Sequence, residues 1–284
     1  MATPAAVGPD AIRAVPVRHW GRWVSGAAVL ALLGWVVWSA VQSGFIDSHE
    51  VRRYQFSHLI LLGLRATVLL AVVAQTAGVV LGVVFAVMRL SKNKVASWLS
   101  GAYIWFFRGT PVLVQLLFWY NGVPSVWKHV TIAVPFTGLT LYSARMVDFM
   151  TPFMAAFLGL ALNEGAYMAE IVRAGILSVD EGQVEAAQAL GMTPMLTLRR
   201  IVLPQAMRVI VPPTGNEFIS MLKTTSLASV VLFPELLRRA GDIYSRTLNP
   251  VPLFVVISLW YLLLTTVASG GQHYLERRYG RRGR

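Results

Sequence analysis

The stretch ATVLLAVVAQTAGVVLGVVFAVM, residues 66–88, contains no Asp, Glu, Lys or Arg. A helix needs roughly 20 apolar residues to cross about 30 Å of hydrocarbon, and backbone N–H and C=O groups in lipid must be hydrogen-bonded within the element. The segment is therefore predicted to be a transmembrane helix. Four further stretches lack charged side chains in the same way: 23–46, 109–127, 149–163 and 247–275. The fold class that we expect is all-α, a polytopic bundle of membrane helices.

The composition of the whole chain agrees with this prediction. Of the 284 residues, 56% are hydrophobic and 13% are charged, and the mean hydropathy is +0.59, which is outside the range of ordinary soluble domains. The net charge is +12, but the basic residues lie beside the hydrophobic stretches instead of forming one patch, which argues against nucleic acid as a partner. Cysteine is absent and the five histidines have no ligand spacing, so we expect no disulfide and no metal site.

The hydrophobic stretches predict about six transmembrane helices. Their expected positions are 22–43, 59–88, 98–121, 150–174, 206–232 and 251–272. If the N-terminus is inside, the inner flanks of these helices hold more Lys and Arg than the outer flanks. The positive-inside rule therefore predicts a multi-pass protein of the cytoplasmic (inner) cell membrane with both termini in the cytoplasm.

Small residues recur at every fourth position of the second predicted helix. They are Ala74, Gly78, Gly82 and Ala86. This spacing places them on one helical face, which is smooth enough for another helix to approach closely. We interpret the stripe as a packing surface inside the bundle or between two subunits.

A water-compatible segment interrupts the hydrophobic pattern between residues 180 and 205. Acidic residues from Asp180 onward are followed by helix formers and then by Gly191, the order typical of a short helix with a glycine stop. A second short helix can begin at Thr193, followed by a proline in the first turn, and run to Pro204. We expect a helix–turn–helix pair in the cytoplasm, with a mixed surface that suits a groove on another protein.

The same loop matches the pattern EAA-x3-G-x9-I-x-LP and resembles the EAA loop of ABC importer permeases. The matching residues are Glu185, Ala186, Ala187, Gly191, Ile201, Leu203 and Pro204. Three further segments, 103–124, 165–179 (GAYMAEIVRAGILSV) and 204–230, are similar to the polar amino-acid subfamily of these permeases, whose members carry histidine, glutamine, glutamate, arginine or cystine. The resemblance covers about residues 59–272.

This resemblance implies the fold of an ABC type I importer permease, and it divides the chain into four parts. They are a flexible cytoplasmic tail (1–20), an additional N-terminal transmembrane helix with an outer loop (21–58), the permease transmembrane domain (59–272) with the cytoplasmic coupling loop 180–205, and a basic cytoplasmic tail (273–284). The family core has five helices, so the first helix is an addition whose role the sequence leaves open.

The resemblance also implies a subunit that translocates a polar amino acid and has no catalytic residue. Its EAA loop would dock on a separate ATP-binding subunit, present in two copies. A second permease subunit, identical or homologous, and an extracytoplasmic solute-binding protein would complete the importer. No glycine directly precedes a lysine, so the GK[ST] of a phosphate loop is missing. We therefore expect no cofactor on this chain, and ATP and Mg on the partner ATPase.

Polar residues at membrane depth are costly and mark functional or pairing sites. The candidates for the substrate pathway are Asn163, Glu164, Tyr167, Asn216, Glu217 and Lys223. In the fourth predicted helix, an amide, a carboxylate and a phenol share or adjoin one face, and together they could recognise the ammonium end of an amino acid.

Three charged residues are assigned to gating or structure: Arg108, Glu170 and Arg173. Glu170 lies three residues before Arg173, which allows an ion pair on one helical face. Arg108 lies near the inner end of the third helix, where Gly109 and Pro111 weaken the helix. Arginine suits a substrate carboxylate, but this depth favours a structural anchor or an inner gate.

Two other functions fit the membrane helices alone. A secondary transporter driven by an ion gradient would use Glu164 and Glu170 as proton carriers, but it would not need an EAA loop. A structural or signalling membrane protein would not need polar residues at membrane depth. The sequence leaves open which amino acid is carried, whether the two permease subunits are identical, and whether the pore itself holds a specific substrate site.

Overall fold

A computed structural model describes residues 20–133, 137 and 140–280. It divides into two units, Met1–Ser48 and His49–Arg284, which are considered separately. In the first unit, α1 (Trp20–Gln42) is a helix of 23 residues, none of which is buried. This helix is long and apolar enough to span a membrane. The expected flexible tail, 1–20, lies outside the described residues up to residue 19.

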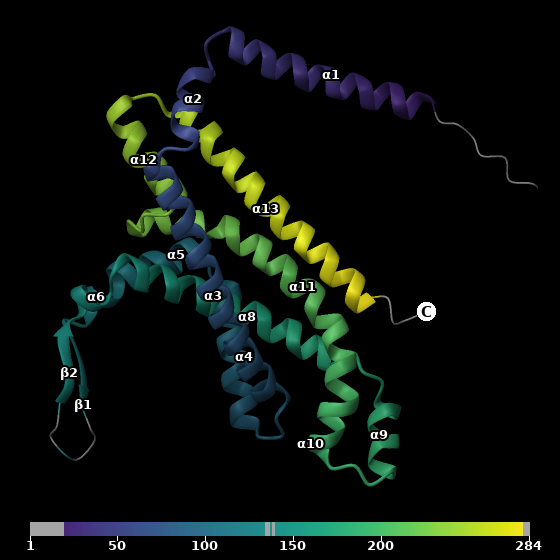
Figure 1. Cartoon of the computed structure of the whole chain (residues 1–284). Coiled ribbons are helices and arrows are strands. Elements are labelled where there is room, and N and C mark those ends of the chain that lie inside the picture. Colours follow the sequence, from purple (N-terminus) through teal and green to yellow (C-terminus); the bar gives the residue numbers. More distant parts are fainter. Residues whose placement is uncertain (1–19, 134–136, 138–139, 281–284) are drawn as a thin grey trace, which may run out of the picture. The chain divides into compact units, whose positions relative to one another are not determined.

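The second unit consists of helices joined by short turns, with one small β-hairpin (Figure 1). Its first elements are α2 (Ser48–Gln55), which begins at the boundary, α3 (His58–Leu90), α4 (Lys94–Gly109), α5 (Val112–Leu117), the π-helical turn η1 (Phe118–Gly122) and α6 (Val123–Val126). The strands β1 (His129–Ala133) and β2 (Thr140–Arg145) follow, and then α7 (Met146–Phe149), α8 (Pro152–Leu177), α9 (Glu181–Ala189) and α10 (Pro194–Thr197). The remaining elements are η2 (Leu198–Val202), α11 (Leu203–Thr224), η3 (Thr225–Val231), α12 (Leu236–Thr247) and α13 (Pro250–Gly280).

The packing of α3 against α8 lies at the centre of the second unit. Ala74, on the predicted stripe of α3, is fully buried. A Cβ atom at Gly78 would lie 2.5 Å from the Cγ atom of Glu164, and a Cβ atom at Gly82 would overlap Met168. The small residues therefore allow a helix-to-helix approach that larger side chains would prevent, as the stripe predicts.

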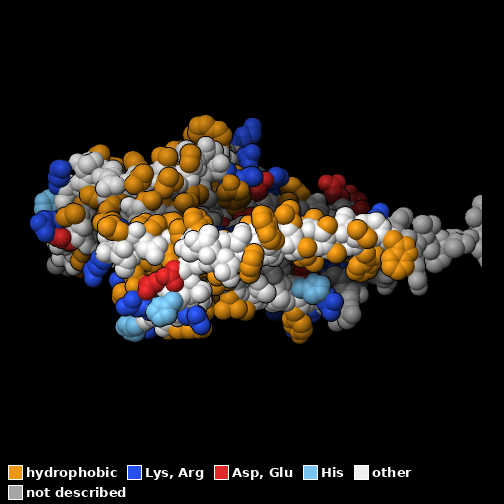
Figure 2. Space-filling model, turned by 90° about the horizontal axis from the view of Figure 1, so that it is seen from above, with side chains coloured by type: hydrophobic (Ala, Val, Ile, Leu, Met, Phe, Trp, Pro, Cys, Tyr) orange, Lys and Arg blue, Asp and Glu red, His pale blue; other side chains and the backbone are white. Residues whose placement is uncertain are grey.

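Several of the described helices are long and apolar enough to cross a membrane. They are α1, α3 and α13, and a fourth candidate is the pair formed by 194–231 and α12, which is bent by 48°. Figure 2 shows hydrophobic side chains over much of the face seen from above, with charged side chains in small groups. Such a surface suits contact with lipid more than contact with water.

The predicted helix 98–121 is divided in two. α4 and α5 lie on either side of Thr110 and Pro111. Thr110 is extended (φ −109°, ψ 141°), because the residue before a proline avoids the helical conformation and the proline has no N–H. The side-chain amide of Gln115 donates to the carbonyl oxygens of Phe107 (3.0 Å) and Thr110 (3.1 Å). The acceptors freed at the break are thus satisfied within the protein, as membrane burial requires.

Pro204 does not end a helix, contrary to the prediction. α10, η2 and α11 form one continuous helix from residue 194 onward, so the span predicted to begin at 206 has no separate start. In the π-helical turn just before the proline, the N–H of Leu203 donates to the carbonyl oxygen of Leu198. This wider turn accommodates Pro204, so that the helix continues through the proline.

α13 extends beyond its predicted end at residue 272. It continues to Gly280, so the first part of the predicted tail 273–284 is helical. Arg277 and Arg278 lie in its last turn, where positive side chains interact favourably with the helix dipole. Residues 281–284 lie outside the described part of the chain.

The β-hairpin is an element that the sequence does not predict. β1 and β2 pair in antiparallel fashion, with His129 opposite Arg145 and Thr131 opposite Ser143. The hairpin precedes α8 in the chain, whereas α9 follows it, and Figure 1 shows the two at opposite ends of α8. α8 therefore connects the region of the hairpin to the predicted coupling loop.

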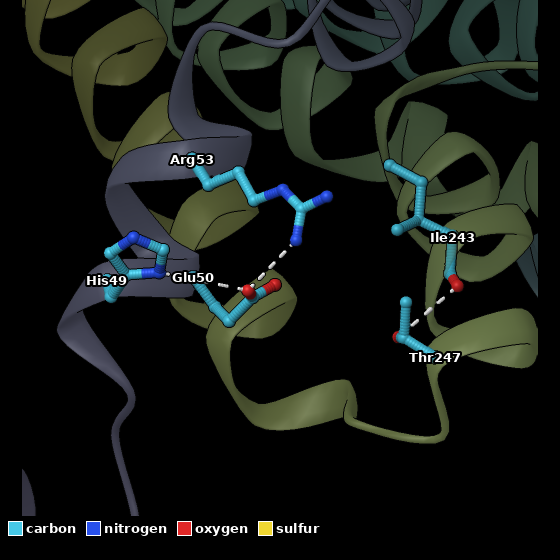
Figure 3. A network of polar contacts seen from close by, with 5 residues as sticks. All are labelled: His49, Glu50, Arg53, Ile243 and Thr247. Carbon is cyan, nitrogen blue, oxygen red and sulfur yellow. Dashed lines mark hydrogen bonds and ion pairs between the residues drawn. The ribbon is translucent and has the colours of Figure 1, made fainter.

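The predicted outer loop contains the short helix α2. Val51 and Tyr54 pack against a buried cluster that includes Leu236 of α12 and Leu253 of α13. On the polar side of α2, the carboxylate of Glu50 lies 3.2 Å from the Arg53 guanidinium and 3.9 Å from the His49 ring. Figure 3 shows this group beside the segment Ile243–Thr247 of α12. α2 is thus attached to the helical bundle.

Candidate functional site

A cavity of about 350 Å³ lies between α5, α8 and α11, and it is called the central cavity below. Four of the predicted pathway residues line it: Asn163, Glu164, Tyr167 and Glu217. The other lining residues are Val112, Leu160, Ser220, Met221 and Thr224. The cavity therefore combines two carboxylates with hydroxyl groups and an apolar wall, an arrangement that can bind a small polar cation.

Glu164 is the most deeply buried of these polar residues. It is only 5% exposed, and its Oε1 atom accepts a hydrogen bond of 2.9 Å from the side-chain amide of Gln75 on α3. Gly78 lies directly against the Glu164 side chain, where a Cβ atom would clash. α3 thus fixes the carboxylate from one side. The sequence reasoning missed Gln75, although it is the single amide in the charge-free stretch 66–88.

Asn163 is anchored to the broken helix. Its side-chain amide donates to the carbonyl oxygen of Phe107 with a length of 2.7 Å. Gln115 donates to the same oxygen, so two amides hold the end of α4. Nearby, the Tyr103 hydroxyl donates to the carbonyl oxygen of Leu162 (2.7 Å). These contacts make Asn163 a support for the cavity wall as well as a lining residue.

Arg108 lies at the edge of the same site. Its guanidinium carbon is 5.0 Å from the centre of the Tyr167 ring, a cation–π contact. The side chain is exposed, and within the described part of the chain it forms no ion pair. The structure therefore brings Arg108, which we assigned to gating or structure, next to the predicted pathway residue Tyr167.

The other predicted charged and polar residues lie apart from the cavity. Arg173 and Glu170 form the predicted ion pair, with Nη2 and Oε2 2.7 Å apart. Asn216 accepts a hydrogen bond of 2.8 Å from Gln272 on α13, and Lys223 is exposed. Neither Asn216 nor Lys223 lines the central cavity, because neighbouring residues on a helix point in different directions.

The predicted coupling loop begins with the short helix α9. The Asp180 side chain accepts a hydrogen bond from the N–H of Gly182 and caps the helix. At the other end, Gly191 has φ +76°, a conformation that glycine adopts without strain. The N–H of Met192 donates to the carbonyl oxygen of Ala187 and closes the helix end.

The surface of this loop is mostly exposed. Glu185, Ala186 and Gly191 are accessible, whereas Ala187 is buried at 3% exposure. Large apolar side chains are also accessible here, with Leu190 83% and Met195 70% exposed. Farther along, Ile201 is half-buried and Leu203 and Pro204 are exposed. Exposed apolar side chains beside small ones are typical of a surface that another protein covers.

Residues 78–281 match the family of binding-protein-dependent transport system inner membrane components. The arginine transport system permease protein of Corynebacterium glutamicum is 44% identical over 95% of this chain and 84% of its own length. The L-cystine transport system permease protein of Bacillus subtilis is 37% identical over 77% of this chain and 86% of its own. A crystal structure of an amino acid ABC transporter with histidines has a TM-score of 0.69 and 37% identity, covering 82% of this chain and 99% of that one.

Proposed function

Because the chain belongs to the family of inner membrane components of binding-protein-dependent transport systems, we propose that its central cavity conducts a cationic amino acid and that its α9 loop transmits the motion of an ATPase. The chain is a multi-pass membrane permease subunit of an amino-acid ABC importer. The importer contains ATPase and permease partners.

The observation that carries the substrate proposal is the pair of carboxylates in the central cavity. Glu164 and Glu217 line it from α8 and α11. One carboxylate oxygen of Glu164 accepts a hydrogen bond from the Gln75 side-chain amide. A guanidinium or ammonium side chain matches carboxylates in charge and hydrogen bonding. The relative from C. glutamicum is named as an arginine transport system permease, which supports an arginine-like substrate. Arg108 at the cavity edge is suited to the substrate carboxylate.

The coupling proposal rests on the exposed loop. Leu190 and Met195 present large apolar side chains beside the accessible Glu185 and Ala186. We assign the docking of the ATPase to this surface, together with Gly191, which sets the turn. ATP and Mg would bind to the ATPase and not to this chain.

The proposed assembly has two permease subunits, identical or homologous, two ATPase subunits and one extracytoplasmic solute-binding protein. The family description names dependence on a binding protein. The distribution of Lys and Arg supports an orientation with both termini in the cytoplasm, so that α9 faces the ATPase and the hairpin faces outward. Within this assembly Glu170 and Arg173 form a structural pair or inner gate.

Transport in proteoliposomes tests the substrate assignment. The permease is reconstituted with its ATPase and binding protein, and uptake of labelled arginine, glutamine and cystine is measured with ATP inside and no ion gradient. We expect arginine uptake to exceed the others and to require ATP. Absence of uptake under these conditions, with uptake appearing when an ion gradient is imposed, would contradict the ABC mechanism. ATP-driven uptake of glutamine alone would contradict only the cationic substrate.

A copurification experiment tests the coupling surface separately. The double variant Leu190→Glu/Met195→Glu places charges on the exposed apolar surface, and we expect it to lose the ATPase during purification while the permease still elutes as a folded protein. Lys92→Glu is the matched control, because Lys92 is exposed in a different turn. Retention of the ATPase by the double variant would show that it docks elsewhere.

A further inference from the structure

We propose that the protein binds the phosphate group of an anionic phospholipid in a basic pocket beside the β-hairpin. The pocket has a volume of about 470 Å³, within the range of about 300–1,000 Å³ that is typical of small-molecule sites. Its polar lining residues are Tyr120, Asn121, Ser125, Lys128, His129 and Arg145. It is called the hairpin pocket below. It shares no lining residue with the central cavity, so the proposal is independent of the proposed substrate.

The hairpin holds the basic residues of this pocket together. In the register of the two strands, His129 lies opposite Arg145. The N–H of Met146 donates to the carbonyl oxygen of Lys128 with a length of 2.9 Å. The backbone of three basic residues is therefore fixed at one end of the ribbon, while η1 and α6 supply the remaining polar side chains.

These side chains offer more hydrogen-bond donors than they use. Within the described part of the chain, Lys128 and His129 have no side-chain hydrogen bond or ion pair. Arg145 binds Asp148 through Nε (2.8 Å) and Nη2 (3.1 Å), which leaves its Nη1 group available. Of the two positive charges of Lys128 and Arg145, only that of Arg145 is paired with a carboxylate, and the pocket has the donors for an anion with several oxygen atoms. A phosphate group has this chemistry.

The surroundings of the pocket favour a lipid phosphate over a free anion. Val126 is 65% exposed, Trp127 55% and Leu141 64%. Trp127 directly precedes Lys128, and tryptophan beside a basic residue is typical of the membrane–water interface. Positive side chains at that depth bind lipid headgroups. A phospholipid would bind its phosphate in the pocket and lay its acyl chains on these apolar side chains, whereas a soluble anion would leave them in water.

Lipid binding by the purified protein tests the proposal. The full-length permease in detergent is titrated with short-chain phosphatidylglycerol or phosphatidylcholine, and bound lipid is measured by native mass spectrometry. We expect preferential binding of phosphatidylglycerol. Lys128→Gln removes one positive charge near the surface and should weaken this binding about fivefold, while Lys128→Arg should restore it. Lys92→Gln is the control, because it removes an exposed lysine far along the chain.

Several outcomes would overturn the proposal. Equal binding of the two lipids, or equal losses in Lys128→Gln and Lys92→Gln, would exclude a specific phosphate site in the hairpin pocket. Inorganic phosphate is added in a parallel titration, and binding of this ion without lipid preference would identify a soluble anion site instead. If an acidic peptide displaces phosphatidylglycerol and binds more tightly than the lipid, the pocket is a protein-docking surface.

Discussion

Replacement of Gly78 by alanine tests the close packing on which the central cavity depends. A Cβ atom at this position would lie 2.5 Å from Cγ and 2.7 Å from Cβ of Glu164, whereas carbon atoms prefer separations of about 3.5–4.0 Å. α3 and α8 must then move apart, or the Glu164 side chain must turn. Either change strains the hydrogen bond of 2.9 Å from Gln75.

The expected change in stability combines two destabilising effects with one that opposes them. Overpacking of a well-packed interior costs about 1–3 kcal/mol, and a weakened buried hydrogen bond adds about 1 kcal/mol. Alanine recovers about 1 kcal/mol through its higher helix propensity. We therefore expect Gly78→Ala to reduce the free energy of unfolding by about 2 kcal/mol, which corresponds to a fall in Tm of about 4–8 °C for a chain of this size.

Thermal unfolding of the purified protein in detergent measures this effect, and Gly270→Ala is the matched control. Gly270 also lies within a helix, but a Cβ atom there would meet nothing within 4 Å. The control should raise the stability by up to about 1 kcal/mol, because only the helix propensity changes. The two variants are thus expected to change Tm in opposite directions. If Gly78→Ala raises Tm as Gly270→Ala does, α3 and α8 are not packed as closely as described.

Three further substitutions test other parts of the structure. Glu164→Gln removes a carboxylate from the central cavity and should reduce arginine uptake at least about tenfold, with unchanged copurification of the ATPase; unaltered uptake would exclude this residue from the substrate path. Gly191→Ala places a Cβ atom at a residue with φ +76°, at a cost of about 1–2 kcal/mol, and should weaken ATPase binding. The control Gly44→Ala, at φ +74°, should have the same local strain and leave ATPase binding intact. Glu235→Ala removes a fully buried carboxylate that accepts hydrogen bonds from Leu237 N–H (2.8 Å), Arg238 N–H (2.7 Å) and the Tyr261 hydroxyl (3.0 Å). Three half-buried donors then lose their acceptor, and we expect a loss of roughly 3 kcal/mol of stability in thermal unfolding. The exposed Glu181→Ala is its control, and similar Tm values for both variants would contradict the buried network.

The sequence predicts the positions of α3 and α8 well, because apolar residues dominate both segments. The prediction 59–88 corresponds to α3 (His58–Leu90), and the prediction 150–174 corresponds to α8 (Pro152–Leu177). It does not predict how a proline acts in its context. Pro111 separates two helices, whereas Pro204 lies within a continuous one. The turns around the two prolines differ. At Pro111 the Gln115 side chain donates a hydrogen bond to a carbonyl oxygen near the break, whereas at Pro204 a π-helical turn accommodates the proline within the helix.

The candidate site could be predicted in part. The helical spacing of Asn163, Glu164 and Tyr167 places them near one another, and they do line one cavity. Partners on other helices do not follow from spacing, because the contact of Gln75 with Glu164 joins residues 89 positions apart. For the same reason, spacing alone does not reveal that Asn216 faces Gln272 on α13 while its neighbour Glu217 faces the cavity.

The two ends of the coupling loop attach to the two helices that carry the carboxylates of the central cavity. α8 continues into the loop at its end, and the loop returns through α10 directly into α11 without a break. Near this junction the helices touch closely, since a Cβ atom at Gly175 would overlap the side chain of Ile210. A force on α9 therefore acts on both helices together. Because packed helices shift between discrete arrangements instead of deforming gradually, we expect an ATPase bound to α9 to move the cytoplasmic ends of α8 and α11. If the two helices then shift by different amounts, the separation of Glu164 on α8 and Glu217 on α11 changes, and with it the affinity that we propose for a cation.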